Sequence, residues 1–230
     1  MTATTMLAIE TSQRQGEVAL QVGDGAIEVE ALQMERGHDD DLMPAIARLA
    51  ARVNVTPQSI DAVCVSIGPG GFTGIRLAVV TAKMLALSIG ATIVAVPSAE
   101  IVAHGTPDLG SGPIMVALAT KRESFWSTVL HRHEDDWVVV GTPCLATIDA
   151  LPSSDVRAIV ADNHAPESLR AWATSSDVPV HAPVFTARAA LVLGRQRLGA
   201  GLTTNAASLE PLYPRPPEAV TLWEQRHQTP

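Results

Sequence analysis

Short apolar segments alternate with polar turns along the first part of the chain, and their spacing predicts strands. Residues 6–9 are continuously apolar, residues 16–22 alternate as a half-buried strand does, and residues 26–33 follow a Gly-Asp-Gly turn. These three segments predict an antiparallel meander of three strands at the start of the chain.

A helix is expected next, over residues 39–53, because its apolar residues recur at helical spacing. The acidic run Asp39, Asp40 and Asp41 precedes them and suits the positive end of a helix dipole. The pattern then predicts a buried strand over 62–67, a glycine-rich loop over 68–74, a helix over 73–88 that stops at Gly90, and a buried strand over 92–96.

The pattern begins again after a segment rich in Gly, Pro and Ser at residues 105–112. A second meander is expected over 114–119, 125–132 and 137–142, followed by a strand over 156–161 and helices over 164–174 and 186–200. This order is that of the ribonuclease-H-like unit, which the actin-like ATPase superfold contains twice. We therefore expect an α/β protein with an N-terminal lobe over 1–104 and a smaller C-terminal lobe over 105–230.

Composition and charge exclude several classes of function. A formal charge of -8 has the wrong sign for the broad basic patch that neutralises nucleic-acid phosphates. Cys64 and Cys144 have no Cys or His at ligand spacing, so neither a disulfide framework nor a zinc site is indicated. The start of the chain lacks the features of a signal peptide, and the apolar stretch 77–89 is interrupted by Lys83. We expect a cytoplasmic protein that is not inserted in a membrane.

The glycine-rich loop is the strongest local signal for chemistry, because a loop between a buried strand and a helix can bind phosphate at the helix N-terminus. It lacks the Lys-Ser/Thr pair of a Walker A loop and the spacing of the dinucleotide fingerprint. The candidate phosphate contacts in and around this loop are Gly68, Gly70, Gly71, Thr73, Gly74 and Arg76. The structural alternative is a tight turn in which glycines allow close backbone approach.

The first hairpin gives a second candidate contact with nucleotide, at Glu10, Thr11 and Ser12. Here too a simple hydrogen-bonded turn is the alternative. The run that begins at His38 and continues into the acidic helix start suggests a solvated helix terminus rather than a metal site. No Ser-His-Asp constellation or nucleophile elbow is present, so no catalytic residue and no metal ligand is assigned.

The segment from Gly68 to Arg76 resembles the Gly-Pro-Gly-Ser-Phe-Thr-Gly-Ile/Leu-Arg block of the bacterial TsaB family. Residues 7–12 are similar to its opening Leu-Ala-Ile-Asp/Glu-Thr-Ser, residues 36–38 to its Arg-x-His stretch, and residues 210–215 to its Pro-x-Tyr-Leu/Val-Arg tail. Three departures are visible: Gly71 stands for the usual serine, residues 119–122 lack the acid of an Asp-Ala-Arg-Arg stretch, and Pro214 interrupts the tail.

The resemblance implies an actin-like fold and a role beside the catalytic paralogue TsaD in threonylcarbamoylation of adenosine 37 in tRNA. TsaD carries a metal-binding His pair on the helix after the strand that matches residues 92–96, and Ser98 and Val102 stand at those places here. The resemblance therefore implies the non-catalytic subunit. Such a subunit requires no cofactor of its own, while ATP or ADP and an accessory ATPase belong to the working complex, and tRNA is contacted only indirectly.

The resemblance also implies a pairing surface on the helices expected over 39–53 and 73–88, used for a homodimer in isolation and for TsaD in the complex. The helix over 75–89 is apolar nearly all round, which requires cover from its own fold or from a partner. The expected contact residues are Leu42, Met43, Ile46, Leu77, Val80 and Met84, with Leu42 and Met43 exposed.

Three other functions stay open at this stage. The first alternative is an ATP-dependent kinase or transferase that uses the cleft between its lobes. The second is a metallo-hydrolase of the old glycoprotease type, and the third is a structural homodimer with no part in tRNA modification. Nucleotide turnover, metal analysis and loss of modified adenosine in a deletion strain would separate these alternatives.

Overall fold

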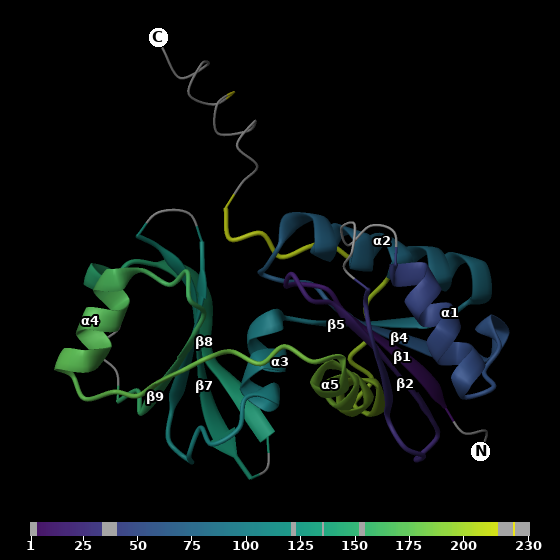
Figure 1. Ribbon diagram of the computed structural model, residues 1–230, viewed down its shortest axis with the longest axis horizontal. Helices are drawn as coiled ribbons and strands as arrows, with labels where there is room; N and C mark the ends of the chain where they lie inside the picture. The colour runs from purple at the N-terminus through teal and green to yellow at the C-terminus, as the bar shows by residue number, and fades with distance from the viewer. Residues whose placement is uncertain are drawn as a thin grey trace.

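Two five-stranded sheets of the same topology form the framework of the protein (Figure 1). The computed structural model describes residues 4–33, 41–120, 123–134, 136–151, 155–215 and 223. The first sheet has the order β3-β2-β1-β4-β5 and consists of β1 (Thr5–Glu10), β2 (Glu17–Val22), β3 (Glu28–Ala31), β4 (Ala62–Ser66) and β5 (Thr92–Val96). The second has the order β10-β9-β6-β7-β8 and consists of β6 (Ile114–Ala119), β7 (Phe125–His133), β8 (Asp136–Ala146), β9 (Ala158–Ala161) and β10 (Val180–His181).

Each sheet begins with an antiparallel meander and continues with two parallel strands. β1 pairs antiparallel with β2 and parallel with β4, and β6 relates to β7 and β9 in the same way. This repeat confirms the predicted α/β fold of the actin-like superfold. The strands predicted over 92–96 and 114–119 coincide with β5 and β6. β10 has only two residues and was not predicted, because so short a segment carries no periodicity.

The helices and sheets alternate in layers. The α-helices of the described residues are α1 (Leu42–Arg52), α2 (Phe72–Ile89), α3 (Ser98–Gly105), α4 (Glu167–Ser175) and α5 (Ala187–Gly199), with 3-10 turns at Pro57–Ser59 and Ile148–Ala150. α1 and α2 cover one face of the first sheet, and α5 covers the other. α3 packs on the second sheet, whose far face α4 covers. α3 and α5 also contact each other, so they form one helical layer between the sheets (Figure 1).

This central layer bears on the lobe boundary predicted at residue 104. The strands do separate there, since the first sheet ends with β5 and the second begins with β6. The helices do not, because α5 lies on β1, β2, β4 and β5 of the first sheet although it follows the second in sequence. The division into 1–104 and 105–230 therefore remains a prediction, and each lobe lends one helix to the central layer.

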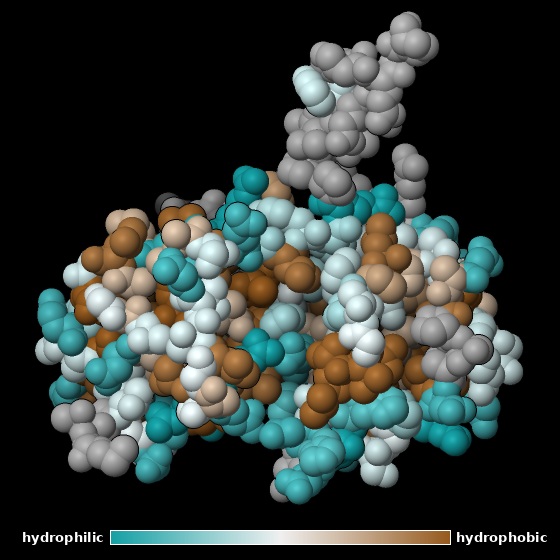
Figure 2. Space-filling view, turned by 180° about the vertical axis from the view of Figure 1, so that it is seen from behind, coloured by the Kyte–Doolittle hydropathy of each residue, from teal (hydrophilic) through white to brown (hydrophobic). Residues whose placement is uncertain are grey.

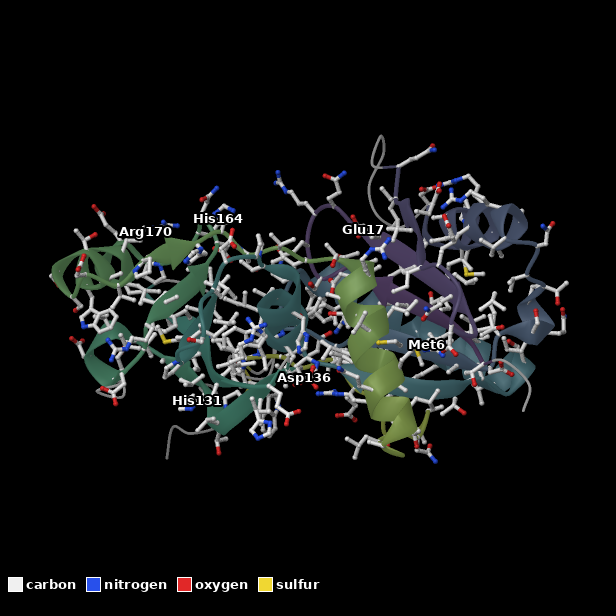
Figure 3. The ribbon with its side chains drawn as sticks, turned by 90° about the horizontal axis from the view of Figure 1, so that it is seen from below. Met6, Glu17, His131, Asp136, His164 and Arg170 are labelled. Carbon is white, nitrogen blue, oxygen red and sulfur yellow. The ribbon has the colours of Figure 1, made fainter. Side chains whose placement is uncertain are left out.

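Close packing of α5 on the first sheet depends on Gly194. A Cβ at this position would lie 2.6 Å from Cys64 Cβ and 2.8 Å from Cys64 Sγ, closer than side-chain atoms approach one another. The Cys64 thiol, fully buried below the helix, donates to the Ala190 carbonyl at 3.0 Å. Figure 3 shows Met6 beside α5, with Asp136 of the second lobe close to the same helix.

Ion pairs fasten α1 to the edge of the first sheet. Arg48 donates to both carboxylate oxygens of Asp41, at 2.8 and 2.9 Å, and to Glu30 on β3 at 2.8 Å. The hydrogen bonds that Asp41 accepts from Arg48 and from the Gln33 amide lower its pKa to about 2. The helix predicted from residue 39 begins at Leu42, and Asp39 and Asp40 lie outside the described residues.

α2 is the longest helix of the described part of the chain and the one helix there that is long and apolar enough to cross a membrane. It spans 18 residues with a mean hydropathy of 1.5, and 33% of it is buried. The core helix of a soluble protein meets the same criteria, and the buried residues of α2 pack in the core beside β4. It ends at Gly90, whose left-handed φ of 75° allows the chain to turn away, as predicted.

Candidate functional site

The glycine-rich loop that precedes α2 lies directly against the turn between β1 and β2. The Thr11 hydroxyl donates to the Gly74 carbonyl at 2.7 Å, and the Gly71 amide donates to the Ser12 carbonyl at 2.7 Å. A Cβ at Gly74 would overlap the Thr11 carbonyl oxygen, and one at Gly70 would overlap that of Ser12. Glycine at these positions is therefore needed for contact between two backbones.

This contact between two backbones gives a structural reason why glycines occur among the candidate phosphate residues. Glu10 and Thr11 are each 1% exposed and Ser12 is fully buried, so these three side chains do not face solvent. Gly71 and Thr73 are exposed where α2 begins, and α2 has no side-chain cap. The phosphate role of Gly68, Gly70, Gly71, Thr73 and Gly74 stays a prediction.

A buried polar cluster lies behind the turn, where β1 and β4 end and α3 begins. The Glu10 carboxylate accepts from the Ser12 amide at 2.7 Å through Oε1, while Oε2 has no hydrogen-bond partner. The Ser66 and Ser98 hydroxyls are hydrogen-bonded to each other at 2.9 Å. Burial raises the pKa of Glu10, and the hydrogen bond from Ser12 offsets part of that rise. The cluster therefore favours a neutral Glu10 carboxyl.

Ser98 and Val102, the positions of the expected metal pair in the catalytic paralogue, are both fully buried. Ser98 is bonded to Ser66, and Val102 packs in the core between α3 and the second sheet. Within the residues that the structure describes, no group of three or more His, Cys, Asp or Glu side chains is arranged to hold a metal ion. His104 is half-buried on α3, and burial lowers its pKa.

Two motifs that lie far apart in the sequence meet at Arg76. Its guanidinium lies 3.6 Å from the centre of the Phe72 ring, and its Nε donates to the Tyr213 hydroxyl at 2.9 Å. The Phe72 and Tyr213 rings are themselves 5.3 Å apart. Arg76 closes the glycine block and Tyr213 belongs to the tail motif, so the structure gives both a shared packing role. Sequence reasoning noted both motifs but missed the contact between them.

The tail that carries Tyr213 crosses from one lobe to the other. Leu209 is buried in the core of the first lobe, and the Leu212 amide donates to the Ile67 carbonyl at 2.7 Å. Further on, Arg215 donates to the Ser124 hydroxyl of the second lobe at 2.6 Å. The tail therefore joins the glycine loop to the second lobe.

The expected pairing surface on α1 and α2 is only partly at the surface. Leu42 is 1% and Ile46 is 6% exposed, so the expectation that Leu42 faces solvent is wrong. Both residues lie on the face of α1 that packs on the first sheet, and Leu77 is half-buried against the same core. Large apolar side chains that are exposed on these helices are Met43, Phe72, Val80, Met84 and Leu87. We call these five residues the α1–α2 surface.

The repeated sheet topology is that of the actin-like superfold. Two comparisons show which proteins the chain resembles. The family model described as "tRNA N6-adenosine threonylcarbamoyltransferase", TsaD, matches residues 30–131. The TsaB protein of Bacillus subtilis, described as a tRNA threonylcarbamoyladenosine biosynthesis protein, is 36% identical over 99 residues. The predicted resemblance to the TsaB family is thereby confirmed.

Two further comparisons add to this picture. An uncharacterized protein of Mycobacterium tuberculosis is 29% identical over 130 residues. In structure, YeaZ of Pseudomonas aeruginosa matches 91% of this chain and 99% of its own with a TM-score of 0.76 at 19% identity, which shows a shared fold. The matched segments span 43% of the B. subtilis protein and 58% of the M. tuberculosis protein. The chain thus spans about half the length of the curated relatives it matches.

Proposed function

We propose that this chain is the non-catalytic subunit that supports a TsaD-type subunit in threonylcarbamoylation of adenosine 37 in tRNA. The similarity to TsaB proteins supports a role in threonylcarbamoyladenosine biosynthesis. The observation that carries the partner role is the α1–α2 surface, where large apolar side chains face solvent on neighbouring helices.

The geometry of this surface suits a partner. Val80, Met84 and Leu87 recur at helical spacing along α2 and are 56%, 57% and 76% exposed, and Met43 on α1 is 54% exposed. A row of large apolar side chains facing water favours association with another protein. Apolar residues also reach the surface on both lobes (Figure 2), so hydrophobicity alone does not define the interface. The proposed occupant is a second copy in isolation and the TsaD-type subunit in the complex.

The remaining parts of the proposal concern chemistry and location. The chain contributes no catalytic residue, metal ligand or required cofactor. In support, the positions expected for a pair of metal-binding histidines are occupied by Ser98, which is bonded to Ser66, and by the buried Val102. ATP or ADP belongs to the assembled complex, which includes an accessory ATPase. The net charge of -8 favours indirect contact with tRNA, and the complex works in the cytoplasm.

Reconstitution tests the proposal. The purified chain is mixed with a TsaD-type subunit, the accessory ATPase, ATP, threonine, bicarbonate and unmodified tRNA, and modified adenosine is measured by mass spectrometry. We expect modification to require this chain. Val80→Glu and Met84→Glu should each weaken binding to the TsaD-type subunit by about tenfold or more, because a charge is then buried in an apolar contact.

Val138→Glu is the matched control, because Val138 is an apolar residue 50% exposed on β8 in the second lobe. It should leave binding and modification unchanged. The interface assignment fails if Val138→Glu weakens binding as much as Val80→Glu does. The function fails if modification proceeds equally well without the chain.

A further inference from the structure

Cationic side chains lie among the exposed apolar side chains of α2. Side chains at intervals of four residues form an exposed row along this helix: Phe72, Arg76, Val80 and Met84. Residues at this spacing lie one above the other on one side of a helix. Lys83 is half-buried and lies on the same side, because seven residues are two turns, about 10 Å along the axis, from Arg76. Two cations therefore lie among the apolar residues of the α1–α2 surface.

Contacts within the protein hold the Arg76 guanidinium in place. It lies 3.6 Å from the centre of the Phe72 ring, and its Nε donates to the Tyr213 hydroxyl at 2.9 Å. Within the part of the chain that the structure describes, its two terminal nitrogens have no hydrogen bond or ion pair. Such nitrogens present the N–H groups with which arginine binds both oxygens of a carboxylate. Arg76 is therefore already oriented for a carboxylate from outside the chain.

The two helices supply no carboxylate that could balance these cations. Neither α1 nor α2 contains Asp or Glu. The acidic side chains beside α1 are engaged by its own arginines, which pair with Asp41, Glu28 and Glu30. Among the described residues, neither Arg76 nor Lys83 has an ion pair. The face that the two helices present is thus positive, although the whole chain carries a charge of -8.

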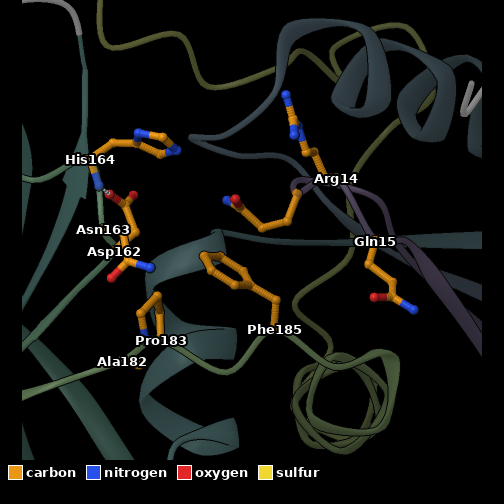
Figure 4. Close-up of a pocket in the computed structure, with 9 residues that line it drawn as sticks. Arg14, Gln15, Asp162, Asn163, His164, Ala182, Pro183 and Phe185 are labelled. Atoms are coloured by element: carbon orange, nitrogen blue, oxygen red, sulfur yellow. Dashed lines mark hydrogen bonds between the residues drawn. The ribbon is translucent and has the colours of Figure 1, made fainter.

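The pocket between the lobes differs in this respect. Its lining includes the Asp162 carboxylate as well as the Arg14 guanidinium (Figure 4). Charges of both signs are present there, so charge does not select a ligand for the pocket. On α2, by contrast, Arg76 and Lys83 have the same sign, and exposed apolar side chains surround them.

We infer that the partner face that covers the α1–α2 surface is apolar and carries carboxylates opposite Arg76 and Lys83. Two copies of this chain would bring two cations each into the contact and no carboxylate from either helix, and like charges across an interface oppose binding. A partner with acidic residues is therefore favoured over a second copy. This inference rests on the proposed function, and it adds the reason why a homodimer would give way to the TsaD-type subunit.

Salt dependence separates these two occupants. Binding to the TsaD-type subunit is measured by isothermal titration calorimetry and self-association by sedimentation equilibrium, each at about 0.05 M and about 0.5 M NaCl. We expect the affinity for the TsaD-type subunit to fall about tenfold or more at the higher concentration, because salt screens the attraction between opposite charges. Self-association should not weaken, because salt screens the repulsion between like charges.

Substitutions locate the charges. Arg76→Gln should weaken binding to the TsaD-type subunit about tenfold, and Lys83→Gln about threefold, because Lys83 is not held in place by an aromatic ring. Arg76→Lys should weaken it less than Arg76→Gln does, since the charge is kept. The variant that combines Arg76→Gln with Lys83→Gln should lose most of the salt dependence. Lys83 makes no hydrogen bond or ion pair with the described residues, so its substitution tests the charge even if Arg76→Gln lowers Tm.

Arg157→Gln is the matched control. Arg157 is an exposed arginine of the second lobe, directly before β9, and has no ion pair among the described residues. Its substitution removes the same charge from another part of the molecule. It should leave the affinity for the TsaD-type subunit and the salt dependence of that affinity unchanged.

The possible failures are distinguishable. Equal affinity at both salt concentrations, or unaltered binding of both Arg76→Gln and Lys83→Gln, would overturn this inference and leave the proposed function standing. Self-association that is as tight as binding to the TsaD-type subunit, and that weakens with salt in the same way, would also overturn it, because the favoured occupant would then be a second copy. Absence of binding to the TsaD-type subunit at either salt concentration would overturn the proposed function, and this inference with it.

Discussion

Gly74→Ala tests whether the glycine block is required by backbone packing. The added Cβ would overlap the Thr11 carbonyl oxygen, which is backbone and cannot rotate away. Overpacking costs about 1–3 kcal/mol, and loss of the buried bond from the Thr11 hydroxyl to the Gly74 carbonyl costs about 1 kcal/mol more. Alanine regains about 1 kcal/mol of helix propensity in the first turn of α2. The net loss is about 2 kcal/mol, which lowers Tm by about 6 °C in a chain of this size.

Gly199→Ala is the matched control. Gly199 also belongs to a helix, and a Cβ there would meet nothing within 4 Å. The substitution should raise the stability by up to about 1 kcal/mol through helix propensity and a less flexible unfolded chain. Thermal unfolding followed by circular dichroism compares both variants with the parent at one pH and concentration. A Gly74→Ala variant that melts at or above the parent temperature would refute the packing argument and leave phosphate binding as the reason for the glycine.

Three further predictions concern single side chains. Burial raises the pKa of Glu10 above its ordinary 4.5. Above pH 4.5 the carboxyl therefore ionises more readily in the unfolded chain than in the folded one, and this difference destabilises the fold. Glu10→Gln should melt at a higher temperature than the parent at pH 7, and the gain should shrink below pH 4.5; an equal gain at pH 4 and pH 7 would contradict this. Burial raises the pKa of Cys64 to about 12. Ellman's reagent at pH 8 should therefore detect only the exposed Cys144 in the native protein and both thiols in denaturant. If both thiols of the native protein react rapidly, α5 does not shield Cys64. Tyr213→Phe should change Tm little, whereas Tyr213→Ala, which removes the ring beside Arg76, should lower it by several degrees; equal effects would show that the hydroxyl, not the ring, holds the tail.

The strands could be predicted because their signals are local. β5 is apolar from Ile93 to its end before Pro97, β6 is an apolar run that begins after Pro113, and each was predicted to the residue. The position of α5 could not be predicted, because its amphipathic pattern shows that one face is buried but not which sheet buries it. The close approach through Gly194 to Cys64 joins residues that are 130 positions apart, and no local pattern records it.

The same limit explains the error at Leu42. Helical periodicity identifies the face that packs on the core, and Leu42 and Ile46 are on that face. A surface for a partner consists of apolar residues that depart from the core pattern, such as Met43 and Met84. The contact of Arg76 with Tyr213, likewise, joins two recognisable motifs whose separation of 137 residues hides their proximity.

The links between the lobes bear on the choice between a partner subunit and an enzyme that closes on its substrate. Gln196 on α5 donates to Asp136 on β8 at 2.8 Å, and Arg197 joins α5 to Glu100 on α3. The tail adds a third link through Arg215. Because α3 and α5 pack against each other between the two sheets, hinge closure would have to break contacts in this layer as well as these polar bonds. The surface on α1 and α2 lies outside this layer, so the proposed pairing requires none of these contacts to break.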